Sequence, residues 1–172
     1  MDHDPIVHLD DLVFEPRPPQ FSPSGDAAER YGAERADIGR RIGALELGYN
    51  LTRIPPGRAA YPAHAHRVNE EMFHVLSGTG RLTIGERAWD LAAGHFVACP
   101  PGGPETAHKI VATGEEPLVL LALSTLEMPE LVEYPDSGKF GVVTVVEDAE
   151  GRPERWAHFG RRDQCLDYWD GE

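Results

Sequence analysis

The sequence has only two cysteines, Cys99 and Cys165, and no apolar run long enough to cross a membrane. A spanning helix needs about 20 apolar residues, so we expect no membrane protein. Two cysteines far apart in the chain suit a reducing compartment and give no disulfide framework. The chain start has no basic segment followed by an apolar stretch, so we predict no secretory signal and a cytoplasmic location.

Basic residues are scarce as well, with 16 Lys and Arg against 29 Asp and Glu, for a net charge of −13. Binding to nucleic acid or to an anionic membrane surface requires a basic patch, so both partners are disfavoured. We find no Ser-His-Asp pattern, phosphate-cradling glycine loop or nucleotide fingerprint. A nucleophilic hydrolase and a nucleotide-dependent enzyme are therefore disfavoured.

The 172 residues, 41% of them apolar, predict one domain with one core. Acids gather at the ends, with seven in residues 1–30 and eight in residues 147–172. This distribution predicts an N-terminal arm over residues 1–41, a barrel over residues 42–146 and a C-terminal tail over residues 147–172, with the arm and tail packed outside the barrel.

Five prolines within residues 1–25 exclude a long helix or a central strand there. Short strands of this arm could still pair with an edge of the sheet. The arm is then either loosely held or exchanged with a second subunit, and the exchange predicts a homodimer. Residues 26–36 predict one or two helical turns capped by Asp26. The aromatic side chains of the tail predict that it docks on the barrel or on a partner subunit.

Turn signals recur every eight to twelve residues from Ile42 onward, which is typical of an all-β protein. No helical period interrupts the apolar runs between the turns, so we predict antiparallel strands arranged as a jelly roll. The predicted strands are Leu45–Ile54, Glu71–Leu76, Arg81–Ile84, His95–Ala98, Ala107–Ala112, Leu118–Leu123 and Val142–Val146.

Four side chains form the most informative pattern: His64, His66, Glu71 and His108. Residues i and i+2 of a strand share a face, so both imidazoles of the His-x-His pair point the same way. Glu71 begins the next predicted strand, and His108 begins a later one. Imidazole and carboxylate ligands suit a divalent transition metal, and Zn, Fe, Mn, Ni and Cu all remain open.

The other histidines are better explained without a metal. His3, His8 and His158 lie in the arms, His74 has the wrong parity relative to Glu71, and His95 follows a turn glycine. Glu70 competes with Glu71 as a ligand. Because Glu71 shares a face with apolar residues, we expect Glu70 to point into solvent. Cys99 precedes a proline at a strand end and suits a small buried apolar position.

The spacing resembles the two sequence signatures of the cupin superfamily. Gly57, His64, His66, Glu71 and Gly78 fit the first, with a gap before His64 that is one residue longer than usual. Gly94, Pro100, Gly102 and His108 fit the second, with a loop three residues longer than usual and Ala112 in place of its asparagine. The tail and the segment 134–139 look like a subgroup of small single-domain bacterial cupins. The resemblance implies a double-stranded β-helix that usually carries one metal ion.

If the ion has six coordination positions, the four protein ligands occupy four of them and two stay open. A substrate oxygen or dioxygen can bind at an open position, which allows Lewis-acid or redox chemistry. Tyr49, Arg53, Arg58, Tyr61 and Phe73 are the residues near the ligands that we consider for the pocket, and barrel packing or surface charge explains each equally well. An arginine among them would pair with a carboxylate or a phosphate of a substrate.

We predict a metal-dependent enzyme acting on a small oxygen-rich metabolite such as a sugar or a carboxylic acid. It would be an isomerase or a lyase, or a dioxygenase that uses Fe(II). The alternative is a non-catalytic module that binds the metal and a metabolite for sensing or storage. A third interpretation, in which the metal only staples the barrel, predicts a buried ion without an open position. A fold hosts many chemistries, so the sequence does not choose the substrate.

Overall fold

The computed structural model describes residues 4–172, apart from the side chains of Gln20 and Arg162; His3 lies outside the described residues. Its strands are β1 Glu15–Pro16, β2 Glu34–Asp37, β3 Leu47–Ile54, β4 Ala65–His66, β5 Glu71–Ser77, β6 Thr79–Ile84, β7 Arg87–Ala92, β8 Phe96–Cys99, β9 His108–Ala112, β10 Leu118–Thr125, β11 Glu130–Tyr134, β12 Lys139–Glu147 and β13 Pro153–Arg161. The α-helix is α1 Asp26–Arg30, and short 3-10 turns cover Leu9–Asp11, Pro19–Phe21, Pro104–Thr106, Pro135–Ser137 and Arg162–Gln164. The helices of the described chain are too short to cross a bilayer.

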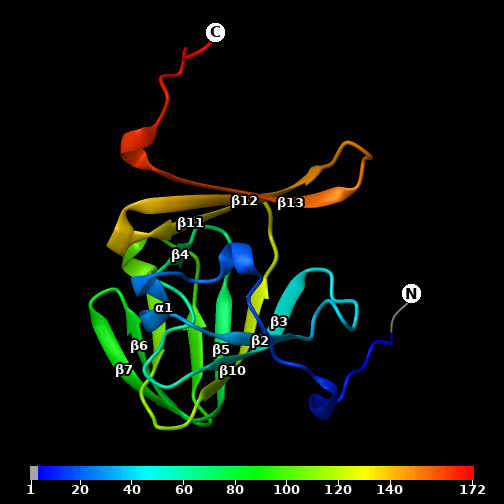
Figure 1. Cartoon of the computed structure of the whole chain (residues 1–172), viewed down its shortest axis with the longest axis vertical. Coiled ribbons are helices and arrows are strands. Elements are labelled where there is room, and N and C mark those ends of the chain that lie inside the picture. The colour runs from blue at the N-terminus through cyan, green and yellow to red at the C-terminus, as the bar shows by residue number, and fades with distance from the viewer. Residues whose placement is uncertain (1–3) are drawn as a thin grey trace.

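The strands form three antiparallel sheets (Figure 1). One sheet has the order β1-β2-β3-β10-β5-β8, the second β13-β12-β11-β4 and the third β7-β6-β9. Because β3 pairs with β10 and β10 with β5, segments distant in sequence lie next to each other in the largest sheet. This arrangement confirms the all-β prediction.

The core lies where the inward faces of these sheets meet. Ile54, Val75, Leu118 and Leu120 are its largest fully buried side chains. Ile54 is opposite Leu118 in the β3–β10 pairing, and Leu120 is opposite Val75 in the β10–β5 pairing. Burying a side chain of this size contributes about 1.5–3 kcal/mol. Two of these residues, Ile54 and Leu120, also line the cavity at the candidate site.

Gly78 makes the tight connection from β5 to β6. Its φ of +80° lies in the left-handed region, and a Cβ there would be 2.5 Å from the carbonyl oxygen of Pro117. Only glycine satisfies both conditions without strain. One of the glycines that carry the cupin resemblance therefore has a direct steric role.

Two expectations about the N-terminal arm need correction. The helix ends at Arg30 instead of continuing to residue 36, because Tyr31 forms a bridge with Ala59 and the chain then enters β2. Asp26 is the first helical residue, and the cap position is Gly25, which has a φ of +54° and no side-chain cap. Tertiary pairing has overridden local helix propensity here.

The C-terminal tail follows the prediction only in part. Residues 153–161 pair along the whole of β12 as β13, whereas the later residues extend away from the sheets (Figure 1). Leu166, Tyr168 and Trp169 are all more than two thirds exposed, so this part does not dock on the barrel. Beyond Val143, β12 pairs with β13 and not with β11, which leaves a protruding two-stranded ribbon.

Candidate metal centre

The backbone brings two of the predicted ligands together directly. His64 and His108 form an isolated antiparallel bridge, in which the His64 amide donates to the His108 carbonyl (3.2 Å) and the His108 amide donates to the His64 carbonyl (2.9 Å). His66 lies in β4, opposite Val132 of β11. Glu71 is the first residue of β5 and lies between Ser124 and Cys99. The four candidate ligands therefore come from three segments of the chain: the stretch 64–66, β5 and β9.

Three imidazoles converge on one carboxylate oxygen. The distances from Oε2 of Glu71 to Nε2 are 3.0 Å for His108, 3.3 Å for His66 and 3.7 Å for His64. Metal–ligand bonds of about 2.1 Å place neighbouring ligand atoms about 3.0–3.4 Å apart. The potential ligand atoms of His64, His66 and Glu71 all lie within 4.8 Å of one another, so this group could hold a metal ion. His108 borders the same point through its contact with Glu71.

The charges of the site also suit a cation. Burial raises the pKa of the Glu71 carboxyl, but its contacts with His108, His64 and His66 outweigh burial and hold the pKa well below its usual range. Burial lowers the pKa of His108, in spite of its hydrogen bond to Glu71. An ionised carboxylate beside a neutral imidazole is the protonation state that a transition metal requires.

His66 supplies the test of fit. Burial lowers the pKa of His66, yet the nearby carboxylates of Glu130 and Glu71 raise it to about 9. Both ring nitrogens are buried, and neither makes a hydrogen bond within the described residues, although carboxylate oxygens lie 3.3 and 3.5 Å away. A buried nitrogen without a hydrogen bond is costly. A cation that replaced the proton on Nε2 would give that nitrogen a partner, so the donor set fits the implied metal.

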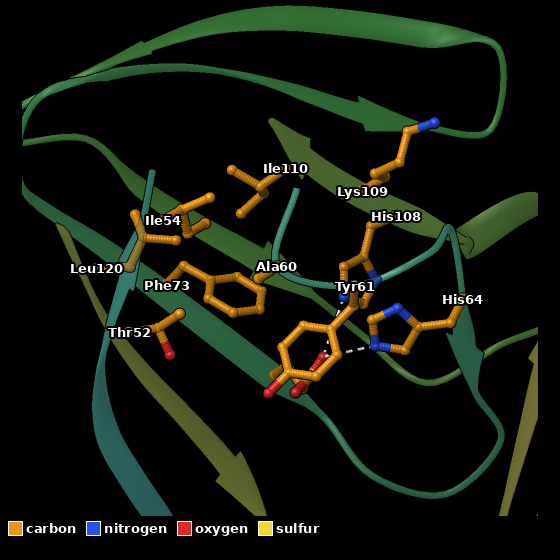
Figure 2. A pocket seen from close by; sticks show the side chains of 11 residues that line it. Thr52, Ile54, Ala60, Tyr61, His64, Phe73, His108, Lys109, Ile110 and Leu120 are labelled. Atoms are coloured by element: carbon orange, nitrogen blue, oxygen red, sulfur yellow. Dashed lines mark hydrogen bonds and ion pairs between the residues drawn. The ribbon is translucent and has the colours of Figure 1, made fainter. Parts of the chain in front are cut away.

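A cavity of about 30 Å³ opens on the ligands, which is room for about one water molecule. Figure 2 shows Ile54, Phe73 and Leu120 gathered on one side and His64 and His108 on the other. The polar groups besides the ligands come from Thr52, Tyr61 and Lys109, and the Lys109 amine points away from the cavity (Figure 2). An ion held here would thus have apolar side chains on one side, and a small molecule could reach it through the cavity.

Comparison with known proteins now identifies the family. Residues 50–124 match the family model of the cupin domain. These residues form a cupin domain. The cupin resemblance and the double-stranded β-helix expected from the sequence are thereby confirmed. A 61-residue stretch is 33% identical to an uncharacterized protein of Methanocaldococcus jannaschii. That stretch covers 36% of this chain and 46% of that protein, so the cupin spans about half the length of this curated relative.

Three solved structures share the fold of this cupin. A sugar phosphate isomerase of the cupin superfamily from Silicibacter pomeroyi is 23% identical, with a TM-score of 0.75 over 96% of this chain and 98% of that one. A putative sugar phosphate isomerase from Acidithiobacillus ferrooxidans is 24% identical, with a TM-score of 0.71 over 89% and 92%. A predicted oxalate decarboxylase from Thermotoga maritima is 19% identical, with a TM-score of 0.56 over 71% and 99%. At these identities the likeness shows the fold alone.

The pocket residues considered from the sequence separate into two groups. Tyr61 and Phe73 line the cavity of the cupin barrel, whereas Tyr49, Arg53 and Arg58 do not. Tyr49 and Arg53 alternate with the cavity-lining Thr52 and Ile54 along β3 and face the other side. Arg53 pairs with Glu34 at 2.5 Å, and the guanidinium of Arg58 packs over Gly32.

The residues that we assigned no metal role are engaged elsewhere, apart from Cys99, which lies opposite Glu71 in the β5–β8 pairing. His74 stacks on Phe96 with ring centres 4.1 Å apart, on the face opposite Phe73. His95 is exposed and accepts a hydrogen bond from the Ala92 amide, and Glu70 is exposed. His8 caps the first 3-10 turn, and His158 stacks on Trp156. Cys99 is buried, and burial together with the charge of Glu71 raises the pKa of its thiol to about 12.

Sequence reasoning missed Glu130, which lies directly behind the ligands. Its buried carboxylate accepts hydrogen bonds from the amides of Arg67 (3.0 Å), Val68 (3.3 Å) and Asn69 (2.9 Å), and from the Asn69 side chain. The same carboxylate lies 3.5 Å from Nδ1 of His66. Glu130 therefore fixes the loop between β4 and β5, and it orients the His66 ring so that Nε2 faces Glu71. The β-prone residues Leu131, Val132 and Tyr134 are the signal that could have revealed this strand.

Proposed function

We propose that this cupin binds one divalent transition metal through His64, His66, Glu71 and His108, and that it acts as a metal-dependent isomerase or lyase on a small oxygen-rich metabolite. The observation that carries the proposal is the convergence of three Nε2 atoms on one Glu71 oxygen, at 3.0–3.7 Å, beside a cavity. Zn, Fe, Mn, Ni and Cu all suit this donor set.

When bound, the ion would supply a Lewis acid that polarises a carbonyl or hydroxyl oxygen of the substrate. The chain itself contributes orientation, because Glu130 behind Nδ1 of His66 keeps Nε2 directed toward Glu71. Phe73, Ile54 and Leu120 exclude water from one side of the site. Tyr61 places a hydroxyl group at the edge of the cavity, where it can donate a hydrogen bond to a substrate oxygen.

The first substrates to assay are phosphorylated aldoses and ketoses, because two proteins that share the fold of this cupin are called sugar phosphate isomerases. Small dicarboxylic acids come second, and oxygen consumption after Fe(II) loading tests a dioxygenase. Non-catalytic binding of a metabolite is the second candidate function. It is favoured by the scarcity of groups that could transfer a proton: besides the candidate ligands, Thr52 and Tyr61 are the polar lining residues, and the Lys109 amine points away from the cavity.

The test begins with protein purified without chelator and with elemental analysis. We expect about one equivalent of transition metal in the wild type and in His158→Ala, a control in β13. His66→Ala and Glu71→Ala should lose the metal while keeping the far-ultraviolet circular dichroism of a folded barrel. A Glu71→Ala protein that retains full metal would refute the ligand assignment. Turnover of a substrate supports the enzyme; a rise in melting temperature without turnover supports the binding module.

A further inference from the structure

Tyr61 is a large side chain in the cavity wall that no strand holds in place. The cavity, at about 30 Å³, has room for about one water molecule, so a sugar or a carboxylic acid needs a wider opening. Most of its lining residues belong to β3, β5, β9 and β10, which are paired within the sheets. The lining residues outside the strands are Ala60, Tyr61 and His64. His64 is fixed by its bridge to His108, and Ala60 has only a methyl group, so Tyr61 is the side chain that can move to widen the cavity.

The Tyr61 ring also lies between the cavity and the solvent. It lines the cavity, yet the residue is 36% exposed. Figure 2 shows the ring between Phe73 on the apolar side and His64 on the other. Its centre is 5.8 Å from that of the His64 ring. In this position the ring covers part of the open side of the cavity, and its displacement would uncover the histidines.

The backbone next to this ring is held by side chains and not by a strand ladder. Within the described chain, two side chains bind the backbone of residues 60–63: Arg17 donates from Nη2 to the Ala60 carbonyl, and Nδ1 of His64 lies 2.9 Å from the Pro62 carbonyl. A carbonyl oxygen can only accept, so Nδ1 of His64 carries the proton and its Nε2 is the nitrogen left to bind or react. The segment can therefore shift without breaking the sheets.

Arg17 makes two contacts that resist such a shift. Besides its hydrogen bond to the Ala60 carbonyl, its guanidinium lies 4.0 Å from the Tyr61 ring centre. A cation in this position is attracted by the ring quadrupole, and Arg17 is half-buried, which strengthens the attraction. The arm is itself anchored just before this point, because the Ala59 amide donates to the Arg30 carbonyl (3.0 Å). One side chain of the N-terminal arm thus fixes both the backbone and the ring at the edge of the cavity.

We infer that Arg17 is a positioning residue that acts through Tyr61. It holds the Tyr61 ring across the open side of the cavity, and a molecule larger than water reaches His64 and His108 when this contact opens. The inference rests on the proposed function in one respect, since it takes the cavity as the place where a substrate binds. A ring that closes again after entry would exclude bulk water from the bound molecule.

The test is the rate at which diethyl pyrocarbonate modifies each histidine of the metal-free, full-length protein, read by tandem mass spectrometry at one pH. This reagent attacks neutral imidazole nitrogens and is too large for the closed cavity. Arg17→Met removes the charge and the donors but keeps most of the length. A cation–π contact and a charge-assisted hydrogen bond together correspond to about a tenfold to hundredfold change in an opening equilibrium. We expect His64 and His108 to react faster by this factor in Arg17→Met, with unchanged rates at the exposed histidines His8, His95 and His158.

Matched variants separate this role from a general effect on the arm. Arg30→Met is the control, because the Arg30 guanidinium also lies over a tyrosine, 5.5 Å from the ring centre of Tyr31, which does not line the cavity. Arg30→Met and Tyr61→Phe, which keeps the ring, should react like the wild type. Tyr61→Ala should react fast, and adding Arg17→Met to it should change nothing further, because Arg17 acts through the ring. Arg17→Lys, which keeps the charge, should react at an intermediate rate.

Three outcomes would overturn the inference. Equal rates at His64 and His108 in the wild type and in Arg17→Met would show that Arg17 does not control access. The same acceleration in Arg30→Met would assign the effect to loosening of the whole arm. A further acceleration when Arg17→Met is added to Tyr61→Ala would show that Arg17 does not act through the ring.

This assay and the test of the proposed function fail separately. The modification rates are measured without metal, so they decide the role of Arg17 even if elemental analysis finds no metal in the purified protein. A wild type that carries its metal but shows the same rates as Arg17→Met keeps the proposed function and loses this inference. The melting temperature of each variant shows whether it is folded, and if Arg17→Met is not, the contrast between Arg17→Lys and the wild type decides.

Discussion

Glu130 allows a quantitative test, because one buried carboxylate supports both the fold and the candidate metal centre. Its side chain is 5% exposed and accepts from three consecutive amides, those of Arg67, Val68 and Asn69. The Arg67 amide has a second acceptor, the Leu131 carbonyl, whereas within residues 4–172 the backbone amides of Val68 and Asn69 donate to Glu130 alone. Glu130→Ala would therefore leave two amides and the His66 ring without their carboxylate.

Removing one partner from a buried charged network costs about 3–5 kcal/mol. We expect Glu130→Ala to lose this amount of unfolding free energy in urea denaturation. Glu130→Gln keeps a neutral acceptor, so it should lose less, about 1–2 kcal/mol. Glu127→Ala is the matched control, because this exposed glutamate lies three residues earlier, and its change should stay within about 0.5 kcal/mol. Loss of a partner behind a metal-bound histidine also weakens metal affinity about tenfold to a hundredfold.

The pH dependence gives the prediction a defined sign. Burial raises the pKa of Glu130, but its contacts with His66 and Asn69 outweigh burial and lower the pKa to about 2. A carboxyl whose pKa is lower in the folded than in the unfolded state stabilises the fold above its unfolded pKa, and the contribution disappears as the pH falls through the folded value. In metal-free protein, the stability difference between the wild type and Glu130→Gln should be constant between about pH 4.5 and pH 6.5. It should shrink toward pH 2 as Glu130 gains a proton, and shrink again toward pH 9 as His66 loses one. A Glu130→Ala protein with wild-type stability and metal affinity would refute this reasoning.

Three further predictions concern the barrel and its surface. Leu118→Ala should lose about 2–5 kcal/mol in urea denaturation because Leu118 is fully buried; equal loss in Leu45→Ala, whose side chain is 89% exposed, would contradict this. Gly78→Ala should be less stable than Gly94→Ala by thermal melting, since both need positive φ but only the Gly78 site clashes with Pro117. Sedimentation should show a homodimer that Trp156→Glu dissociates, because the β12–β13 ribbon exposes apolar side chains. A monomeric wild type would remove the dimer proposal.

Short-range patterns predicted most of the strands and brought attention to the four residues of the candidate metal centre. The His-x-His pair and the parity of Glu71 relative to Phe73 both depend on strand alternation, which is a property of adjacent residues. His108 could be predicted as a ligand because it follows a recognisable Pro/Gly-rich loop. The bridge between the His108 and His64 backbones could not be predicted, since nothing in the local sequence specifies which distant segment pairs with residue 108.

Glu130 and Arg17 show where sequence reasoning ends. Glu130 is 61 residues from Asn69, and its role depends on β11 pairing with a two-residue strand, β4, that has no periodic signal of its own. Arg17 lies in a proline-rich segment, where no period indicates which surface the side chain contacts. The helix predicted over 26–36 was too long for a related reason, because the pairing of Tyr31 with Ala59 is invisible in the local propensities.

The reciprocal hydrogen bonds between His64 and His108 have a consequence for how the centre would exchange its ion. These bonds join backbone groups and do not depend on a cation. Binding an ion would therefore cost little conformational entropy of the backbone at His64 and His108. Removal of the ion by a chelator should therefore leave the backbone at both histidines in place. Different metal ions added in turn should then bind at the same position without refolding of the protein.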